Sequence, residues 1–262
     1  MFHYTKALIR AIPRIIVTYF GYLKRYARHI DKYPRELRFN RMRTLSKHLL
    51  KALEADIHVF GLENIPMDTN FCMVSNHMSM IDPLPFMVNY EKPLTFVGKI
   101  ELLKTPMLPT AFKAIEGEYI ERDNLRQTLK IMLKVEEDLK KHEKSWMIFP
   151  EGTRIRDQLL PVGPFHPGTF RPATKAGVPI VPAAMYGSFR VLKKKPQFKK
   201  YPIFISFLKP LMPEDYKGLP TSDIAQLTHD MIQREITYHL RPLDHKYMSE
   251  SKDKKYRFTQ VL

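Results

Sequence analysis

Short apolar runs alternate with longer amphipathic stretches from residue 56 onward. The apolar runs have the length of strands, and we expect strands at residues 56–60, 71–75, 94–98, 118–121, 146–149, 179–185 and 203–208. The stretches between them predict helices at residues 83–89, 106–114, 124–141 and 169–176. Several of the expected strands are continuously apolar, which is typical of a sheet covered on both faces. The pattern therefore predicts an α/β fold with a mostly parallel sheet covered by helices on both faces.

The N-terminal segment mixes basic and apolar residues and shows no strand pattern. Residues 1–56 contain thirteen Lys and Arg against four Asp and Glu, a net charge of +9. Its longest apolar stretch, residues 15–23, is much shorter than the roughly twenty residues of a transmembrane helix. We expect a helix lying in the membrane interface, with apolar side chains in the acyl boundary and cations at the headgroups. The cations that flank this stretch are Arg10, Arg14, Lys24 and Arg25.

A second N-terminal helix is expected at about residues 35–53, where leucines recur at helical spacing. Two interpretations of this helix stay open, since its apolar face could enter the membrane interface or pack on the protein core. The chain thus divides into N-terminal membrane-interface helices at residues 1–55, an α/β domain at residues 56–248 and a polar tail at residues 249–262.

Composition limits the classes of partner. The 262 residues are 44% hydrophobic, enough for one substantial core, and carry a formal net charge of +16. Such a charge favours an anionic partner: nucleic acid, an anionic membrane surface or a phosphorylated substrate. The single cysteine, Cys72, excludes an internal disulfide and lies in an expected strand, where we interpret it as a small core residue.

Two short motifs follow expected strands and carry the candidate chemistry. The segment NHMSMID at residues 76–82 places His77 five positions before Asp82, and Pro83 directly after it predicts that Asp82 caps a helix. The segment FPEGTR at residues 149–154 places a carboxylate and a guanidinium around a glycine.

The spacing of His77 and Asp82 carries little weight by itself, because the chain contains a second copy. His239 and Asp244 are separated by the same number of residues. They lie in or just after the amphipathic stretch at residues 224–240, which predicts an ordinary helix. The context of His77, at the end of an apolar strand, therefore makes it the candidate.

With two further segments, these motifs resemble those of the glycerolipid acyltransferase superfamily, the lysophosphatidic acid acyltransferases. The further segments are GEYIER at residues 117–122 and VPIVPAA at residues 178–184. All four occur in the family's order, over roughly residues 56–208. The resemblance implies that residues 56–248 form an acyltransferase domain.

The resemblance implies attack by an acceptor alcohol on the thioester of an acyl donor. His77 would take the hydroxyl proton as general base, and Asp82 would fix its tautomer and stabilise the imidazolium. The chain has no Gly-x-Ser-x-Gly elbow, so we expect no covalent acyl-enzyme.

The implied substrate-binding residues lie in the later motifs. They are Glu151, Gly152, Thr153, Arg154, Arg122 and Lys99. Arginine suits a phosphate monoester, because its planar fork binds two oxygens and keeps its charge. We expect Glu151 to orient an arginine or to bond the glycerol backbone, and Gly152 to allow close approach of the chain. One departure is visible: many members have lysine where this chain has His166, so we assign His166 no binding role.

The leading hypothesis is transfer of a fatty acyl group from acyl-CoA or acyl carrier protein to the sn-2 hydroxyl of lysophosphatidic acid, giving phosphatidic acid. It requires no metal or other cofactor and places the protein on the cytoplasmic face of the cell membrane, in contact with membrane lipids. Within the same class, glycerol 3-phosphate or another lysophospholipid could be the acceptor.

Two hypotheses from other classes are weaker. A basic nucleic-acid-binding protein would explain the charge but neither motif, so we expect no nucleic acid partner. A structural membrane protein with lost activity would not explain why His77, Asp82, Glu151 and Arg154 are all present.

Overall fold

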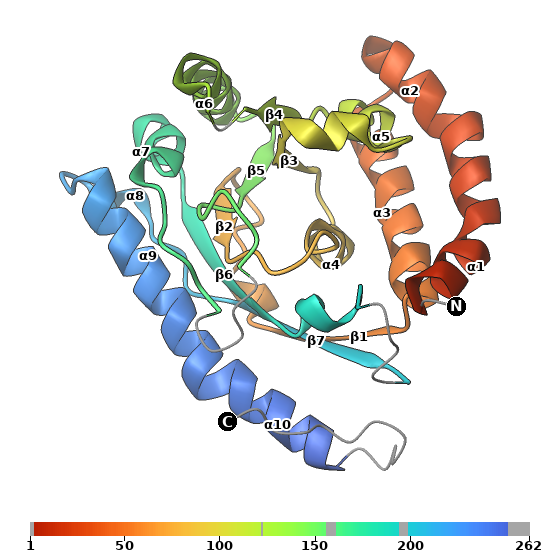
Figure 1. Cartoon of the computed structure of the whole chain (residues 1–262). Coiled ribbons are helices and arrows are strands. Elements are labelled where there is room, and N and C mark those ends of the chain that lie inside the picture. Colours follow the sequence, from red (N-terminus) through yellow and green to blue (C-terminus); the bar gives the residue numbers. More distant parts are fainter. Residues whose placement is uncertain (1–2, 122, 156–160, 194–198, 251–262) are drawn as a thin grey trace.

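The structure is a computed structural model that describes residues 3–121, 123–155, 161–193 and 199–250. Within these residues, seven strands form one sheet (Figure 1). They are β1 (Ala55–Phe60), β2 (Cys72–Ser75), β3 (Leu94–Lys99), β4 (Glu118–Ile120), β5 (Ser145–Ile148), β6 (Ile180–Tyr186) and β7 (Tyr201–Phe207). Each corresponds to a strand that the hydrophobic pattern predicts.

The sheet is mostly parallel, as predicted. Its strand order is β1-β7-β6-β2-β5-β3-β4. All neighbouring pairs are parallel except β6 and β7, so β1 and β7 run against the other strands. Because β2, β5, β3 and β4 are adjacent and parallel, the loops that follow them leave the sheet at the same edge.

The helices predicted from the pattern are present, with ends that differ by a few residues, and the described residues contain two more that were not predicted, at residues 213–216 and 241–250. They are α1 (His3–Thr18), α2 (Lys24–Arg28), α3 (Arg35–Ala52), α4 (Pro83–Asn89), α5 (Leu108–Ala114), α6 (Leu125–Lys140), α7 (Arg171–Ala176), α8 (Pro213–Tyr216), α9 (Thr221–Glu235) and α10 (Arg241–Glu250). A π-helical turn, Tyr19–Leu23, joins α1 to α2. The expected start of α5 is two residues too early, because Met107 has a left-handed φ of 67° that a helix cannot include.

Helices cover both faces of the sheet, as predicted (Figure 1). On one face Met73, Met147 and Val181 form a core with side chains from α2, α3, α4 and α5. On the other face Val74 and Ile148 pack with side chains from α6, α7 and α9. Alternate residues of strands such as β2 thus enter different cores, which explains why several of the strands are continuously apolar. Cys72 belongs to the second core, where burial raises the pKa of its thiol to about 12.

The helix α1 packs on α3 and leaves an apolar face uncovered. Ala11 is buried and Ile15 packs against the core. Ile15 belongs to the stretch expected to enter the membrane, and for this side chain the expectation is wrong. The uncovered face of α1 and the following turn consists of Ile9, Ile12, Ile16, Val17 and Phe20, with exposed fractions of 40–58%. Among the described residues, no helix has the length and apolar character needed to cross a bilayer.

Two of the cations expected at the headgroups interact with other parts of the protein. Arg10 forms an ion pair with Glu54 at 2.8 Å, and Arg14 donates a hydrogen bond to the ring of His48. Arg10 still exposes 61% of its side chain. Attraction to a membrane would therefore compete with these contacts.

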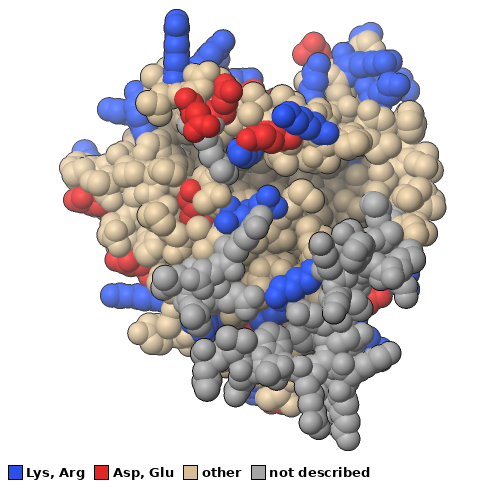
Figure 2. All heavy atoms as spheres, viewed as in Figure 1, with Lys and Arg blue, Asp and Glu red and all other residues tan. Residues whose placement is uncertain are grey.

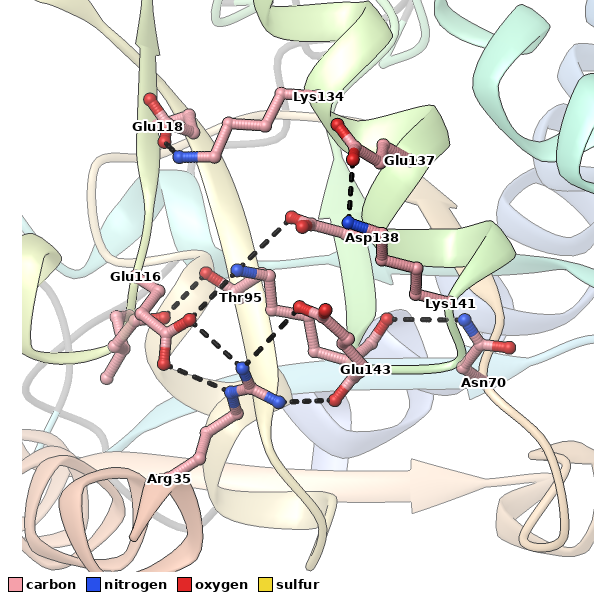
Figure 3. Close-up of polar contacts among 12 residues, drawn as sticks. Arg35, Asn70, Thr95, Glu116, Glu118, Lys134, Glu137, Asp138, Lys141 and Glu143 are labelled. Carbon is pink, nitrogen blue, oxygen red and sulfur yellow. Dashed lines mark hydrogen bonds and ion pairs between the residues drawn. The ribbon is translucent and has the colours of Figure 1, made fainter. Parts of the chain in front are cut away.

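The helix α3 packs on the protein core, which decides between the two interpretations of this segment. Phe39, Met42, Leu45 and Leu50 are buried in the same core as the strands. At the start of α3, Arg35 donates two hydrogen bonds of 3.1 Å to the carboxylate of Glu116, and a third to the backbone carbonyl of Glu143 (Figure 3). The N-terminal helices are thereby fixed to the α/β domain.

The residue at the centre of this charge cluster is Glu116, which also binds Arg38 and Lys144. The side chains of Arg38 and Lys144 are 4% and 3% exposed, and Lys144 also pairs with Asp138 at 3.2 Å. Burial opposes ionisation of Glu116, but hydrogen bonds from Arg35 and Arg38 and the charge of Lys144 outweigh it. They hold the pKa of Glu116 well below its usual range.

The second His-x4-Asp pair lies in the C-terminal helices and its members do not contact each other. The His239 ring bonds Glu235 at 2.5 Å, one helical turn away, whereas Asp244 forms a buried ion pair with Arg190. As predicted from its context, His239 is an ordinary helix residue. The helix α10 ends at Glu250, and residues 251–262 lie outside the described residues, so the division of the chain at residues 55 and 248 stays a prediction.

Candidate active site

The two main motifs lie side by side at one edge of the sheet. His77 follows β2 after one residue, and Phe149 directly follows β5. The two strands are paired in parallel, with Val74 opposite Ile148, so the motifs leave the sheet together. Figure 2 shows Lys and Arg side chains in the middle of the face seen in Figure 1, over the ends of the central strands.

The imidazole of His77 is oriented by Asp82. Nδ1 of His77 lies 2.8 Å from Oδ2 of Asp82, whose side chain is fully buried. Because a carboxylate only accepts hydrogen bonds, Nδ1 carries a proton and Nε2 of the neutral ring is free to act as a base. His77 makes no other side-chain hydrogen bond within the described residues, and its side chain is 18% exposed. This is the arrangement that general-base catalysis requires.

The Asp82 carboxylate does not cap the helix that follows it, which corrects the prediction from Pro83. Asp82 does stand at the cap position of α4, but it makes no side-chain cap hydrogen bond. Oδ2 instead accepts from the backbone N–H groups of Met78 and Ser79 at 2.7 and 2.8 Å. The carboxylate thus folds back on its own loop, because three donors of that loop, including His77, converge on one oxygen.

Phe149 supports the other side of the imidazole. Its ring stacks on that of His77 with centroids 4.2 Å apart and planes 20° from parallel. Phe149 is the first residue of the FPEGTR segment, and its role was not predicted from the sequence. Its position directly after an adjacent strand is the sequence signal that could have identified it.

Glu151 joins the two motifs through the backbone. Oε2 accepts from the N–H of His77 and Oε1 from the N–H of Gly163, both at 2.9 Å. Glu151 is 4% exposed, and burial raises its pKa to about 8; the two N–H bonds oppose this rise and the charge of Asp82 adds to it. Among the described residues it forms no hydrogen bond or ion pair with an arginine, so the expected role of orienting one stays a prediction.

The segment after Glu151 turns and returns to His77. Gly152 has a φ of 63°, which glycine adopts at low cost, and Ile155 donates its N–H to the carbonyl of His77 at 2.8 Å. Thr153 and Arg154 lie between these two points, and both are exposed. Arg154 makes no ion pair within the described residues. Its exposed side chain belongs to the same turn, whose Ile155 bonds His77.

The remaining two expected binding residues follow the next strands along the edge. Lys99 is the last residue of β3, exposes 41% of its side chain and pairs with Glu101. β3 lies next to β5, so the structure brings Lys99 to the same edge as the two motifs. Arg122 lies outside the described residues, but Ile120, which precedes it by two positions, is paired with Lys99. His166 is exposed, and its N–H bonds the carbonyl of Pro150.

No group of three or more His, Cys, Asp or Glu side chains in the described parts of the chain is arranged to hold a metal ion. The chemistry that these residues can perform themselves is proton transfer by His77 next to cationic side chains. This combination suits reaction of a hydroxyl on a molecule that carries a phosphate.

Comparison with known proteins agrees with this chemistry. Residues 56–186 match the model of the Acyltransferase family. The chain is 29% identical to a protein of Mycoplasma pneumoniae named "Probable 1-acyl-sn-glycerol-3-phosphate acyltransferase", over 84% of this chain and 86% of that protein. It is 27% identical to the 1-acyl-sn-glycerol-3-phosphate acyltransferase of Saccharomyces cerevisiae, over 71% and 61% of the two chains.

A solved structure has the same fold. The crystal structure of the 1-acyl-sn-glycerophosphate acyltransferase PlsC from Thermotoga maritima superposes with a TM-score of 0.69 at 22% sequence identity. The similarity covers 90% of this chain and 98% of that one. Since the family model spans half of the chain and includes both motifs, this protein belongs to the acyltransferase family.

Proposed function

We propose that this protein transfers a fatty acyl group to the sn-2 hydroxyl of 1-acyl-sn-glycerol 3-phosphate, lysophosphatidic acid, and so forms phosphatidic acid. The observation that supports this most directly is the contact between His77 and the FPEGTR segment. Glu151 and Ile155 bond the two sides of the His77 peptide, and Arg154 lies between them in the sequence. The proposed base and the proposed phosphate-binding cation thereby belong to two loops that are bonded to each other.

The reaction needs two proton transfers at His77, one in each direction. Nε2 takes the proton of the acceptor hydroxyl as its oxygen attacks the thioester carbonyl, so a C–O bond forms. Collapse of the tetrahedral intermediate breaks the C–S bond, and the imidazolium returns the proton to the departing sulfur. Asp82 stabilises the imidazolium between these steps. General-base catalysis of this kind contributes roughly 10²- to 10⁴-fold in rate.

The acceptor's phosphate would be bound by the cations at the edge of the sheet. Arg154 is exposed and lacks an ion-pair partner in the described chain, whereas Lys99 already pairs with Glu101. We therefore place the phosphate nearest Arg154 and assign Arg122 the supporting role that the sequence motif implies. Thr153 and Gly152 supply a hydroxyl and a close backbone approach in the same turn.

The reaction is proposed to occur at the cytoplasmic surface of the cell membrane. A lysolipid and its diacyl product both reside in a bilayer, and the uncovered apolar face of α1 would hold the enzyme against it. A peripheral or monotopic attachment agrees with the chain's charge of +16, since anionic headgroups attract it. No metal or other cofactor enters the proposed mechanism.

Product analysis by mass spectrometry tests this proposal. The purified protein should be offered lysophosphatidic acid, glycerol 3-phosphate and several lysophospholipids, each with acyl-CoA and with acyl carrier protein. We expect phosphatidic acid from lysophosphatidic acid, and the two donors will show which thioester is used. Acylation of glycerol 3-phosphate alone would reassign the acceptor, and the absence of any acyl product with either donor would contradict the proposal.

A further inference from the structure

Asn76, the residue between β2 and His77, is completely buried and contacts the strand on the far side of the site. Its Oδ1 accepts from the N–H of Met185 and its Nδ2 donates to the carbonyl of Met185, both at 2.9 Å. Nδ2 also lies 3.5 Å from the carbonyl of Pro161. A single side chain thus satisfies both backbone groups of one residue in β6.

This contact continues the sheet after the backbone of β2 has left it. The last ladder pair between the two strands is Ser75 with Ala183. Beyond it, the amide of Asn76 supplies one donor and one acceptor to Met185, in place of the backbone groups of a continuing β2. A primary amide is well suited to this, because it carries both functions on one plane. Without it, the N–H and carbonyl of Met185 would be buried without a partner.

The next residue is held from the opposite direction. The backbone N–H and carbonyl of His77 bond Glu151 and Ile155, which follow β5. β2 lies between β6 and β5 in the sheet. Two consecutive residues are therefore tied to the two neighbouring strands, Asn76 through its side chain and His77 through its backbone.

We propose that Asn76 is a positioning residue: by replacing the ladder bonds of β2 on Met185, its amide fixes the point where the chain turns and so sets the place of the His77 imidazole. This inference rests on the proposed role of His77 as the base. Asn76 does not touch the reacting atoms, and its effect passes through His77.

The test compares Asn76→Ala and Asn76→Asp with a matched control at the other end of the same strand. Asn70 is also buried, lies just before β2 and donates to the carbonyl of Leu139 at 2.8 Å, at the edge of the sheet opposite the motifs. For both Asn76 variants we expect kcat for acyl transfer to fall by about 10²-fold, the loss typical of a misplaced catalytic group, with KM for lysophosphatidic acid within about twofold. Asn70→Ala should lower the melting temperature. Its kcat, measured well below that temperature, should stay within about twofold of the value for the unchanged protein.

The aspartate variant keeps an oxygen acceptor for the N–H of Met185 and preserves the side-chain shape, so it serves if the alanine variant does not fold. A double variant then separates positioning from general weakening. In a His77→Ala background, Asn76→Ala should reduce the residual rate by no more than about twofold, because its effect has no base left to act through.

Two results would overturn the inference: equal kcat losses in the Asn76 and Asn70 variants, or a full additional loss in the double variant. High activity of His77→Ala would instead reject the proposed base, and the inference with it. An inactive His77→Ala together with a fully active Asn76→Ala would reject the positioning role alone.

Discussion

Oε2 of Glu151 accepts a hydrogen bond from the backbone N–H of His77, so a carboxyl group with a raised pKa lies directly behind the candidate base. The same carboxyl holds the N–H of Gly163. Glu151 is thus positioned to stabilise the folded loops of the site through the two backbone N–H groups that it binds.

The raised pKa of Glu151 predicts a pH dependence of stability. In the folded protein it is about 8, whereas 4.5 is the value for an unperturbed glutamate. Between these values the folded state holds a proton that the unfolded state has lost. This contribution to the free energy of unfolding is therefore present below pH 4.5 and is lost as the pH rises toward 8, at no more than about 1.4 kcal/mol per pH unit. Urea denaturation from pH 5 to 9 measures it.

Glu151→Gln is the matching variant, because a glutamine cannot titrate. The difference in unfolding free energy between the original protein and the variant should shrink with rising pH. The glutamine presents one oxygen to the N–H groups of His77 and Gly163. We therefore also expect the variant to be less stable than the original protein at pH 5, by about 1–3 kcal/mol. A difference that does not vary between pH 5 and 9 would show that Glu151 does not titrate in this range.

The proposed base is tested by comparing the two His-x4-Asp pairs. His77→Ala should lower kcat by roughly 10²- to 10⁴-fold, because the acceptor alcohol loses its base. Asp82→Asn should also reduce kcat, since an amide can leave the wrong tautomer on His77. The control is His239→Ala, in which we expect nearly unchanged rates. If His239→Ala were inactive and His77→Ala active, the assignment of the site would be wrong.

Arg154 should affect the acceptor much more than the donor. We expect Arg154→Ala to raise the KM for lysophosphatidic acid by about tenfold or more, as a lost charged hydrogen bond implies, with little change in the KM for the acyl donor. Arg154→Lys should recover only part of this, because an ammonium lacks the planar fork. The sequence predicts the same pattern for Arg122→Ala. Steady-state kinetics with each substrate varied in turn measures both KM values. A rise in the KM for the acyl donor instead would show that these arginines bind the carrier of the thioester.

Glu116→Gln should destabilise the fold, because it leaves the buried Arg38 without a carboxylate partner and Lys144 with only Asp138. We expect a loss of roughly 3–5 kcal/mol in the free energy of unfolding near pH 7. Since the pKa of Glu116 is lowered in the fold, its stabilisation is present above about pH 4.5 and is lost as the pH falls below that value. Glu137→Gln, in an exposed ion pair with Lys141, is the control and should leave the urea midpoint unchanged.

Membrane attachment should depend on the uncovered face of α1. Aspartates at Ile16 and Phe20, which are 46% and 58% exposed, should release the protein from anionic vesicles in a sedimentation assay. Tyr238→Asp is the control, because Tyr238 is 80% exposed on a different helix. Salt should weaken binding of the unchanged protein without abolishing it, because burial of apolar side chains is not screened. Full release by moderate salt would contradict an inserted helix.

The fold could be predicted from sequence because burial on both faces leaves a direct trace in each strand. Residues 71–74 are apolar at every position, and the seven expected strands alternate with amphipathic stretches. The ends of helices were less well predicted where a single backbone angle determines the first residue, as at Met107 before α5. The common edge of His77, Glu151 and Lys99 follows from the parallel pairing of β2, β5 and β3, which the strand pattern alone does not specify.

The contacts within the site could not be predicted in the same way. Asn76 and Met185 are 109 residues apart, and no periodicity relates a side-chain amide to a distant peptide group. Asp82 reads as a helix cap because Pro83 follows it, yet the converging N–H groups of its own loop determine where its carboxylate points. Similarly, Arg35, Glu116 and Lys144 look like surface charges in the sequence, since only folding brings their segments together.

The ion pairs around Glu116 attach the N-terminal helices directly to the rest of the fold. α3 is joined to the α/β part of the chain by the ion pairs of Glu116 and α1 packs on α3, so the apolar face of α1 has a fixed orientation relative to His77. An enzyme held in this way would rest on a bilayer at one height and one tilt. The distance from the bilayer to Nε2 of His77, which a lysolipid hydroxyl must cover, would then be fixed by the fold. The contacts that determine it lie far from His77.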